Sequence, residues 1–137
     1  MFQSCLTGAH ATDHPLMLGL ARAQFALDDH AGACATLDRL RAAHPDLACP
    51  DGHLLYARSK EEQGDVEQAL IEYAALAAYY PGEEARCRLA LLLQKTGRVA
   101  EARAQFQQVV RSVERASKLY YRAEREWYQV ARRNLAP

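Results

Sequence analysis

Small and bulky apolar residues return in the same order three times along the chain, with helical spacing inside each copy. The copies fall into register when the chain is shifted by 36 residues and then by 33 residues. A repeat of this length with helical periodicity predicts three stacked helix hairpins. The columns that define the register are Ala21, Ala57 and Ala90; Ala33, Ala69 and Ala102; Leu37, Tyr73 and Phe106; and Leu40, Leu76 and Val109.

Breaks in the helical pattern divide each copy into two helices. Asp28-Asp29, Gly64-Asp65 and Gly97-Arg98 stand at the same place in each copy, where Gly or Asp tolerates the backbone of a tight turn. Pro45 and Pro81 end the second helix of the first two copies. The predicted repeats are residues 14–49, 50–82 and 83–113.

The two ends of the chain differ from the repeats. Residues 1–13 show no periodic pattern and are interpreted as a frayed end or as the remnant of an earlier helix. Residues 114–137 predict a capping helix, because the last hairpin of a stack must cover its open face. Its apolar stripe is predicted to consist of Tyr120, Ala123, Trp127, Val130 and Ala131, with Trp127 as the buried anchor.

Composition supports an all-α fold of about seven helices. The chain has 137 residues, of which 26 are Ala, whereas Val, Ile and Thr together number only 11. Alanine favours helices and β-branched residues favour strands. The apolar runs are much shorter than the ~20 residues that a membrane span requires. The sequence therefore predicts no span in this chain.

The cysteines indicate a reducing compartment. Cys5, Cys34, Cys49 and Cys87 are far apart and form no C-x-x-C pair. A chain of this size can bury a core without disulfides, so we expect reduced, structural cysteines and a cytoplasmic protein. An anchor preceding residue 1, which would make the chain part of a membrane-anchored protein, stays an alternative.

The columns resemble those of the tetratricopeptide repeat. The pairs Leu20-Ala21, Tyr56-Ala57 and Leu89-Ala90 match its first helix, and residues 63–70 give the nearest single match. The tryptophan column of the family holds Met17, His53 and Arg86 instead. The resemblance implies a short right-handed superhelix of antiparallel hairpins, and a module that binds a peptide or helix of another protein in its concave groove.

The resemblance also implies which side chains line the groove. Arg22 and Arg58 occupy equivalent positions, and two guanidinium groups could hold a carboxylate of the partner. The alternative is that Arg58 pairs with Glu61 or Glu62 on its own helix, and Arg22 with Asp28 or Asp29. The implied groove residues are Leu18, Arg22, Phe25, Leu54, Arg58, Glu61, Cys87, Leu91 and Gln94.

No catalytic motif stands out in the sequence. Phosphate-binding glycine loops, a nucleophile elbow and a zinc-protease motif are all missing from it. His10 and His14 have the spacing of two ligands on one helix face, but a zinc site normally needs three or four protein ligands. The prediction is a non-enzymatic protein with no cofactor and no metal.

Charge is balanced over the whole chain but not along it. Seventeen basic residues match 17 acidic ones, while residues 61–84 carry seven acidic and no basic residues and residues 85–137 carry twelve basic and four acidic ones. Tyr121, Arg125, Tyr128 and Arg132 form a basic and aromatic stripe on the last helix. An anion- or nucleic-acid-binding accessory domain is therefore the alternative function, which the balanced net charge disfavours.

Two further expectations concern the setting of the protein. The acidic flank of one chain could meet the basic end of a second copy, which would give a homodimer. Arg exceeds Lys by 14 to 3 in an alanine-rich chain, which favours a GC-rich bacterial genome. The favoured function is a scaffold or adaptor part of a bacterial assembly.

Overall fold

A computed structural model describes residues 14–137, and the regular structure within this range is entirely helical. The all-α class and the seven helices are confirmed for these residues. The predicted N-terminal segment 1–13, with Cys5 and His10, lies outside them. The helices are α2 (His14–Ala26), α3 (His30–Ala43), α4 (Pro50–Glu62), α5 (Val66–Ala77), α6 (Glu84–Lys95), α7 (Val99–Arg115) and α8 (Lys118–Leu135).

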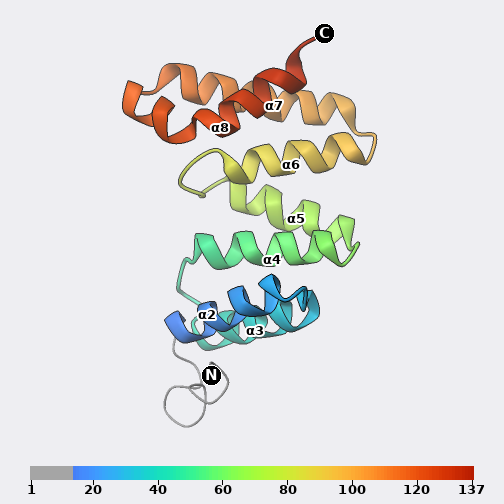
Figure 1. Ribbon diagram of the computed structural model, residues 1–137, viewed down its shortest axis with the longest axis vertical. Helices are drawn as coiled ribbons and strands as arrows, with labels where there is room; N and C mark the ends of the chain where they lie inside the picture. The colour runs from blue at the N-terminus through green and yellow to red at the C-terminus, as the bar shows by residue number, and fades with distance from the viewer. Residues whose placement is uncertain (1–13) are drawn as a thin grey trace. The chain divides into compact units, whose positions relative to one another are not determined.

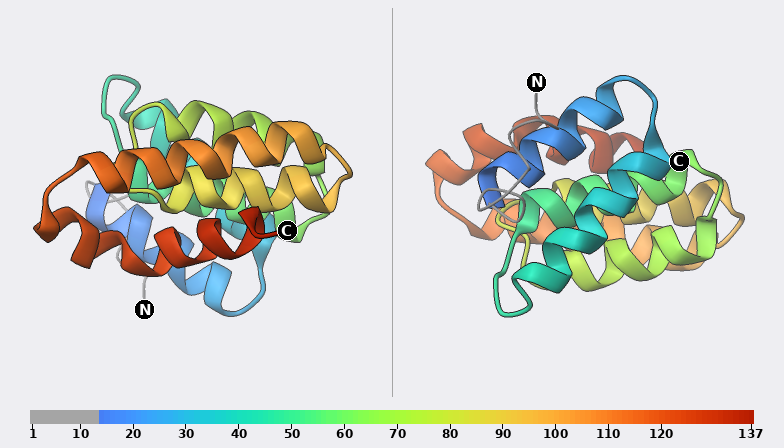
Figure 2. Two further views of the ribbon diagram at one scale, coloured as in Figure 1. Left: turned by 90° about the horizontal axis from the view of Figure 1, so that it is seen from above. Right: turned by 90° about the horizontal axis from the view of Figure 1, so that it is seen from below.

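The chain divides into two compact units, of which the first ends at Glu72 and the second begins at Tyr73, inside α5. In the first unit α2 and α3 form a hairpin, and α4 packs against both of them (Figure 1). In the second unit α6 and α7 form a hairpin, and α8 packs along α7 and also touches α6 (Figure 2). Each hairpin joins helices that are neighbours in sequence, as the repeat predicts.

The turn inside each hairpin has the same backbone conformation. The helices before the turns end at Ala26, Glu62 and Lys95, and these ends keep the spacing of 36 and then 33 residues. The residue two positions later is left-handed in every copy, with φ of 63° at Asp28, 82° at Gly64 and 87° at Gly97. The predicted turns are therefore confirmed, and the first copy makes its turn without a glycine.

Asp28→Gly is expected to stabilise the first unit, because a left-handed backbone is strained in a residue with a Cβ and free of strain in glycine. The gain should be at most about 1 kcal/mol, since Asp tolerates this region and its carboxylate lies 3.7 Å from the His30 ring nitrogen. Urea unfolding of the variant measures it. Gly64→Asp, the reverse change at the equivalent turn, should lower stability by a similar amount.

The four apolar columns are buried throughout, so the sequence located the core correctly. Even the largest of these side chains, Tyr73 and Phe106, are at most 1% exposed. The small residues of the columns, such as Ala21 and Ala33, are fully buried where two helices of a hairpin approach each other. Burial of this apolar surface is the main force that holds each hairpin together.

The last helix packs on α7 and α6 through most of the predicted stripe, since Tyr120, Trp127 and Val130 are half-buried and Ala131 is buried. Ser117 caps α8, because its hydroxyl accepts from the Tyr120 backbone N–H at 3.2 Å. Ala131 is buried, but Ala123 is exposed and Trp127 is only half-buried, with the Arg88 guanidinium 5.2 Å from its ring centre. The prediction of Ala123 in the stripe was therefore wrong, and Trp127 belongs to the stripe but is only half-buried.

The inward face of α8 also includes Glu124. This carboxylate accepts a hydrogen bond from the Glu83 backbone N–H at 2.7 Å, so a charged residue that the predicted stripe did not include faces α6. Among residues 14–137, none of the helices combines the length and apolar character that crossing a bilayer requires.

Candidate partner-binding surface

Arg22 and Arg58, the two arginines expected to contact a partner, come from α2 and α4 of the first unit. Arg22 Nη2 lies 3.5 Å from Asp51 Oδ2, and both side chains are more than half exposed. Asp51 lies in the first turn of α4, so this ion pair joins the two helices. The alternative partners of Arg22, Asp28 and Asp29, belong to the turn after α2.

Arg58 rests on an aromatic ring of α2. Its guanidinium carbon lies 4.8 Å from the centre of the Phe25 ring. The edge of the His30 ring packs against the same ring, with 4.8 Å between centroids. Phe25 follows Arg22 by three residues, which places both on one face of α2. The structure therefore brings Arg22, Phe25 and Arg58 to one strip between α2 and α4.

The other candidates of the first unit lie deeper. Leu18 and Leu54 are buried, and Glu61 is half-buried. Leu18 belongs to the apolar cluster of this unit, together with Met17 and Leu37. The two leucines are therefore not accessible to a partner, whereas the arginines and Phe25 are at least partly exposed.

The candidates of the second unit, Cys87, Leu91 and Gln94, lie on α6 and do not share one environment. Cys87 is fully buried, and its thiol donates to the Trp127 backbone carbonyl of α8 at 3.3 Å. The capping helix thus covers the position, so the Cys87 side chain does not reach the surface as the sequence prediction required. Leu91 and Gln94, farther along α6, are exposed.

The predicted basic and aromatic stripe of α8 is partly tied to α7. The Tyr121 and Tyr128 rings pack edge to face with centroids 5.4 Å apart. The Tyr128 hydroxyl donates to Glu114 at 2.7 Å, and Arg132 lies 3.7 Å from the same carboxylate. Arg125 and Arg132 remain exposed. Glu114 therefore neutralises part of the charge of this stripe.

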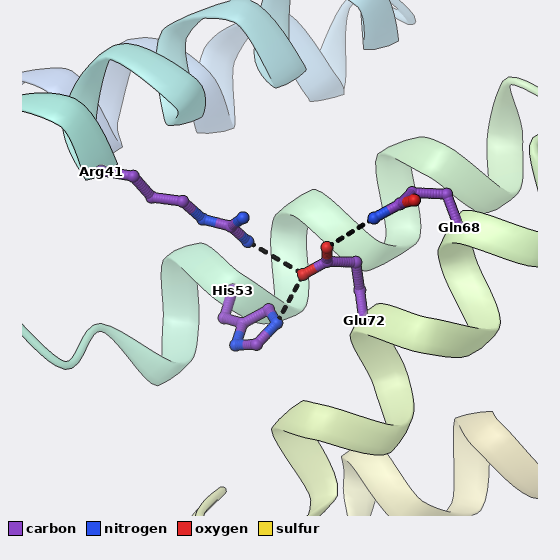
Figure 3. A network of polar contacts seen from close by, with 4 residues as sticks. All are labelled: Arg41, His53, Gln68 and Glu72. Atoms are coloured by element: carbon purple, nitrogen blue, oxygen red, sulfur yellow. Dashed lines mark hydrogen bonds and ion pairs between the residues drawn. The ribbon is translucent and has the colours of Figure 1, made fainter. Parts of the chain in front are cut away.

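A polar network around the buried Glu72, which the sequence did not predict, joins three helices of the first unit (Figure 3). Glu72 of α5 is buried; one carboxylate oxygen accepts from Arg41 at 3.0 Å and lies 2.8 Å from His53 Nε2. The other oxygen accepts from the Gln68 side-chain amide at 2.8 Å. The available signal was the place of Glu72 between the repeat columns at Ala69 and Tyr73, where a charged residue needs partners.

The network sets the ionisation of its members. Burial raises the pKa of Glu72, but the hydrogen bonds from Arg41 and Gln68 and the charges of Arg41 and His53 outweigh burial and lower it overall. Burial lowers the pKa of His53 and outweighs the attraction of Glu72. His53 is therefore neutral near pH 7 and donates its Nε2 proton to the Glu72 carboxylate.

A second acidic group lies in the loop before α6. The Tyr120 hydroxyl of α8 donates to the Glu83 side chain, while the Glu83 backbone N–H donates to Glu124. Gly82 precedes this contact with φ of 124°, and a Cβ there would lie 2.8 Å from Glu124 Oε1. Burial raises the pKa of Glu83 and outweighs the opposing effects of Tyr120 and Arg86. This contact fixes the start of α8 to the start of α6.

Glu83→Gln is expected to flatten the pH dependence of the second unit above pH 4.5, the ordinary pKa of Glu83. Because the folded-state pKa of Glu83 is raised, its contribution is fully present below that value and is lost as pH rises through the folded pKa. Glutamine keeps the acceptor for Tyr120 without the charge. The melting temperatures of wild type and Glu83→Gln, measured from acidic to neutral pH, test this expectation. If the melting temperatures of both proteins depend on pH with the same slope, the expectation is contradicted.

Histidines and cysteines of the described residues do not assemble a metal centre. No group of three or more His, Cys, Asp or Glu side chains in residues 14–137 is placed to hold an ion. His14, the described member of the predicted histidine pair, lies beside Cys49 instead. Cys34, Cys49 and Cys87 are free thiols.

Comparison with known proteins identifies the repeat. The sequence profile of the tetratricopeptide repeat matches residues 16–47, 51–82 and 84–113, which is more than half of the chain. The three matches coincide with the three helix pairs α2–α3, α4–α5 and α6–α7. A search of curated protein sequences found no match.

Proposed function

Because the chain belongs to the tetratricopeptide repeat family, we propose that it is a non-enzymatic module that binds a peptide or helix of a partner protein. Membership of the family supports a protein partner in general. The proposal adds that the protein serves as a scaffold or adaptor in a bacterial assembly, for which the arginine- and alanine-rich composition is the support.

The observation that carries the proposal is the strip of Arg22, Phe25 and Arg58 between α2 and α4. Arg58 stacks on Phe25, and His30 packs against the same ring, so the Arg58 guanidinium loses little conformational entropy when it binds. Arg22 has only an exposed ion pair with Asp51, which is worth about 0–1 kcal/mol and is readily exchanged for another carboxylate. We therefore propose that the strip takes an acidic side chain or terminal carboxylate of the partner, with apolar contacts beside it.

A charge-reversal pair tests this surface. The Arg22→Glu, Arg58→Glu double variant and an Arg39→Glu, Arg103→Glu control change the same total charge, and Arg39 and Arg103 are exposed on α3 and α7. Affinity capture from native extract should enrich one protein with wild type and with the control, and lose it with the first variant. Equal capture of the partner by all three folded proteins would exclude the strip as the partner-binding surface.

A second candidate function rests on the basic surface of α8. Residues 73–137 contain twelve Arg and Lys residues against six Asp and Glu residues. The alternative is that Tyr121, Arg125, Tyr128 and Arg132 bind single-stranded nucleic acid or another anion. In that case binding to a homopolymeric oligonucleotide should weaken steeply with salt, and Arg125→Glu with Arg132→Glu should abolish it. The pairing of Tyr128 and Arg132 with Glu114 makes this candidate the weaker one.

Self-association and location complete the proposal. Residues 14–72 carry five basic and ten acidic residues, so their net charge is opposite in sign to that of residues 73–137. A homodimer is therefore a third possible outcome, which a mass measurement by light scattering decides.

The free thiols Cys34, Cys49 and Cys87 support a reducing compartment. On that ground we propose a cytoplasmic location, with attachment to a membrane anchor as the alternative.

A further inference from the structure

The outer side of α8 continues a column of the repeat that the other hairpins bury. Ala123 stands 33 residues after Ala90, so it extends the column of Ala21 and Ala90. These two alanines, on α2 and α6, are 0% exposed because the second helix of each hairpin packs on the first. Ala123 is exposed, and Leu119, one helical turn before it, is 75% exposed. No helix of the described residues therefore covers this side of α8.

The residues on this side of α8 form one stripe that combines apolar residues with two opposite charges. Their spacing of i, i+3, i+4, i+7 and i+11 follows a single face of a helix. Arg122 and Glu126 are exposed, and neither has an ion pair or a side-chain hydrogen bond within the part of the chain that the structure describes. Val130, at the margin, is half-buried. The outer stripe of α8 thus consists of Leu119, Arg122, Ala123, Glu126 and Val130.

This composition matches a second copy of the same stripe. A terminal helix that meets only water carries a polar outer face, whereas Leu119 and Ala123 are apolar. Because Arg122 and Glu126 have opposite charges, a two-fold axis between two copies brings each residue next to its complement. Pairing of Arg122 with Glu126 on its own helix competes only weakly, since an acidic residue that follows its basic partner by four positions is the less favourable order.

We propose that the outer stripe of α8 is a self-association surface, on which a second copy of this chain places its own α8 in antiparallel orientation. An antiparallel helix is also what the second helix of each hairpin supplies to the buried alanine column. With the two-fold axis between residues 124 and 125, Leu119 and Val130 both lie about 8 Å from the axis along the helix. Leu119 of one copy therefore lies opposite Val130 of the second copy.

The same axis places the two charges within reach of each other. Arg122 and Glu126 lie about 4 Å and about 2 Å from the axis along the helix, because a helix rises 1.5 Å per residue. Each Arg122 guanidinium can then pair with Glu126 of the second copy, which gives two equivalent ion pairs. The Ala123 side chains lie between these pairs, and their small size allows the two helices to approach closely.

This surface is separate from the contacts considered above. The proposal does not rest on the strip of the first unit, and it uses a different side of α8 from the basic and aromatic stripe. A dimer in which the acidic part of one chain meets the basic part of another would join unlike surfaces and would not depend on a pair between Arg122 and Glu126. Substitutions at these two residues therefore distinguish the two kinds of dimer.

Sedimentation equilibrium of the full chain measures the dissociation constant of the dimer. One helix from each copy makes a small interface, so we expect about 10–100 µM for wild type. Arg122→Glu and Glu126→Arg each place like charges across the axis and should each raise the dissociation constant about tenfold. The double variant with both changes restores opposite charges across the axis and should associate as wild type does. Arg39→Glu, an exposed change on α3 with the same change in charge as Arg122→Glu, should have no effect.

Three results would overturn the proposal. The first is a wild-type chain that is monomeric at about 500 µM, a measurement that needs no variant. The second is a double variant that associates as weakly as the two single variants, because the charges would then not face each other across an axis. The third is association that Arg39→Glu weakens as much as Arg122→Glu does, which would indicate attraction between the acidic and basic parts of two chains. Circular dichroism checks that each of these exposed substitutions leaves the fold intact.

Discussion

Phe106→Ala should lower the free energy of unfolding of the second unit by about 3–5 kcal/mol, the largest effect we expect from a single substitution. Phe106 is 1% exposed in the middle of α7. Its removal costs the transfer free energy of the ring and leaves a cavity that rigid neighbours fill only in part. Because α7 packs against both α6 and α8, all three helices should be affected.

The measurement is urea unfolding followed by far-UV circular dichroism, with hydrogen exchange to locate the loss. Exchange should accelerate in α6–α8 more than in α2 and α3, since repeat proteins transmit stability mainly to adjacent repeats. Gln107→Ala, an exposed change on the same helix, is the control and should stay within about 0.5 kcal/mol of wild type. A loss below about 1 kcal/mol for Phe106→Ala would show that this column is not a packed core.

Glu72→Ala should cost the first unit about 2–3 kcal/mol, because it removes the shared partner of Arg41, His53 and Gln68. His53 is largely buried and would keep a ring N–H without its carboxylate acceptor. Arg41 is about half exposed, so water compensates for part of its loss. The figure therefore lies below that for breaking a fully buried ion pair.

The cost of Glu72→Ala should depend on pH in a defined direction. The folded-state pKa of Glu72 is lowered from 4.5, so its contribution is present above that value and is lost as pH falls through the folded pKa. The difference between wild type and variant should therefore be constant near neutral pH and narrow in acid. Glu67→Ala, an exposed change on the same helix, should show almost no difference. A difference that grows in acid would contradict this account of the network.

The repeat made most of the helix layout predictable from the sequence. The turn at Asp28, for example, was located because Gly64 and Gly97 stand in the same column, although a single Asp is a weak turn signal. Columns such as Leu37, Tyr73 and Phe106 predicted the core in the same way. Three copies of one pattern separate a structural requirement from chance at each position.

The incorrect or missing predictions concern contacts that occur only once in the chain, so the repeat pattern does not indicate them. Glu124 faces inward because its partner is the Glu83 backbone N–H, 41 residues away and outside the repeated columns. Cys87 was assigned to the groove by its repeat position, but α8 covers that position in the last copy. Glu72 is buried because α3 and α4 supply Arg41 and His53. None of these pairings follows from local periodicity.

The strip between α2 and α4 is the central claim, and amide chemical-shift mapping tests it most directly. A peptide selected by display against the whole chain is titrated into the ¹⁵N-labelled protein. We predict that the largest shifts occur around Arg22, Phe25 and Arg58, and that Arg22→Glu with Arg58→Glu abolishes binding while Arg39→Glu with Arg103→Glu preserves it. Shifts confined to α8, or a peptide that the first double variant binds as tightly as wild type, would contradict the claim.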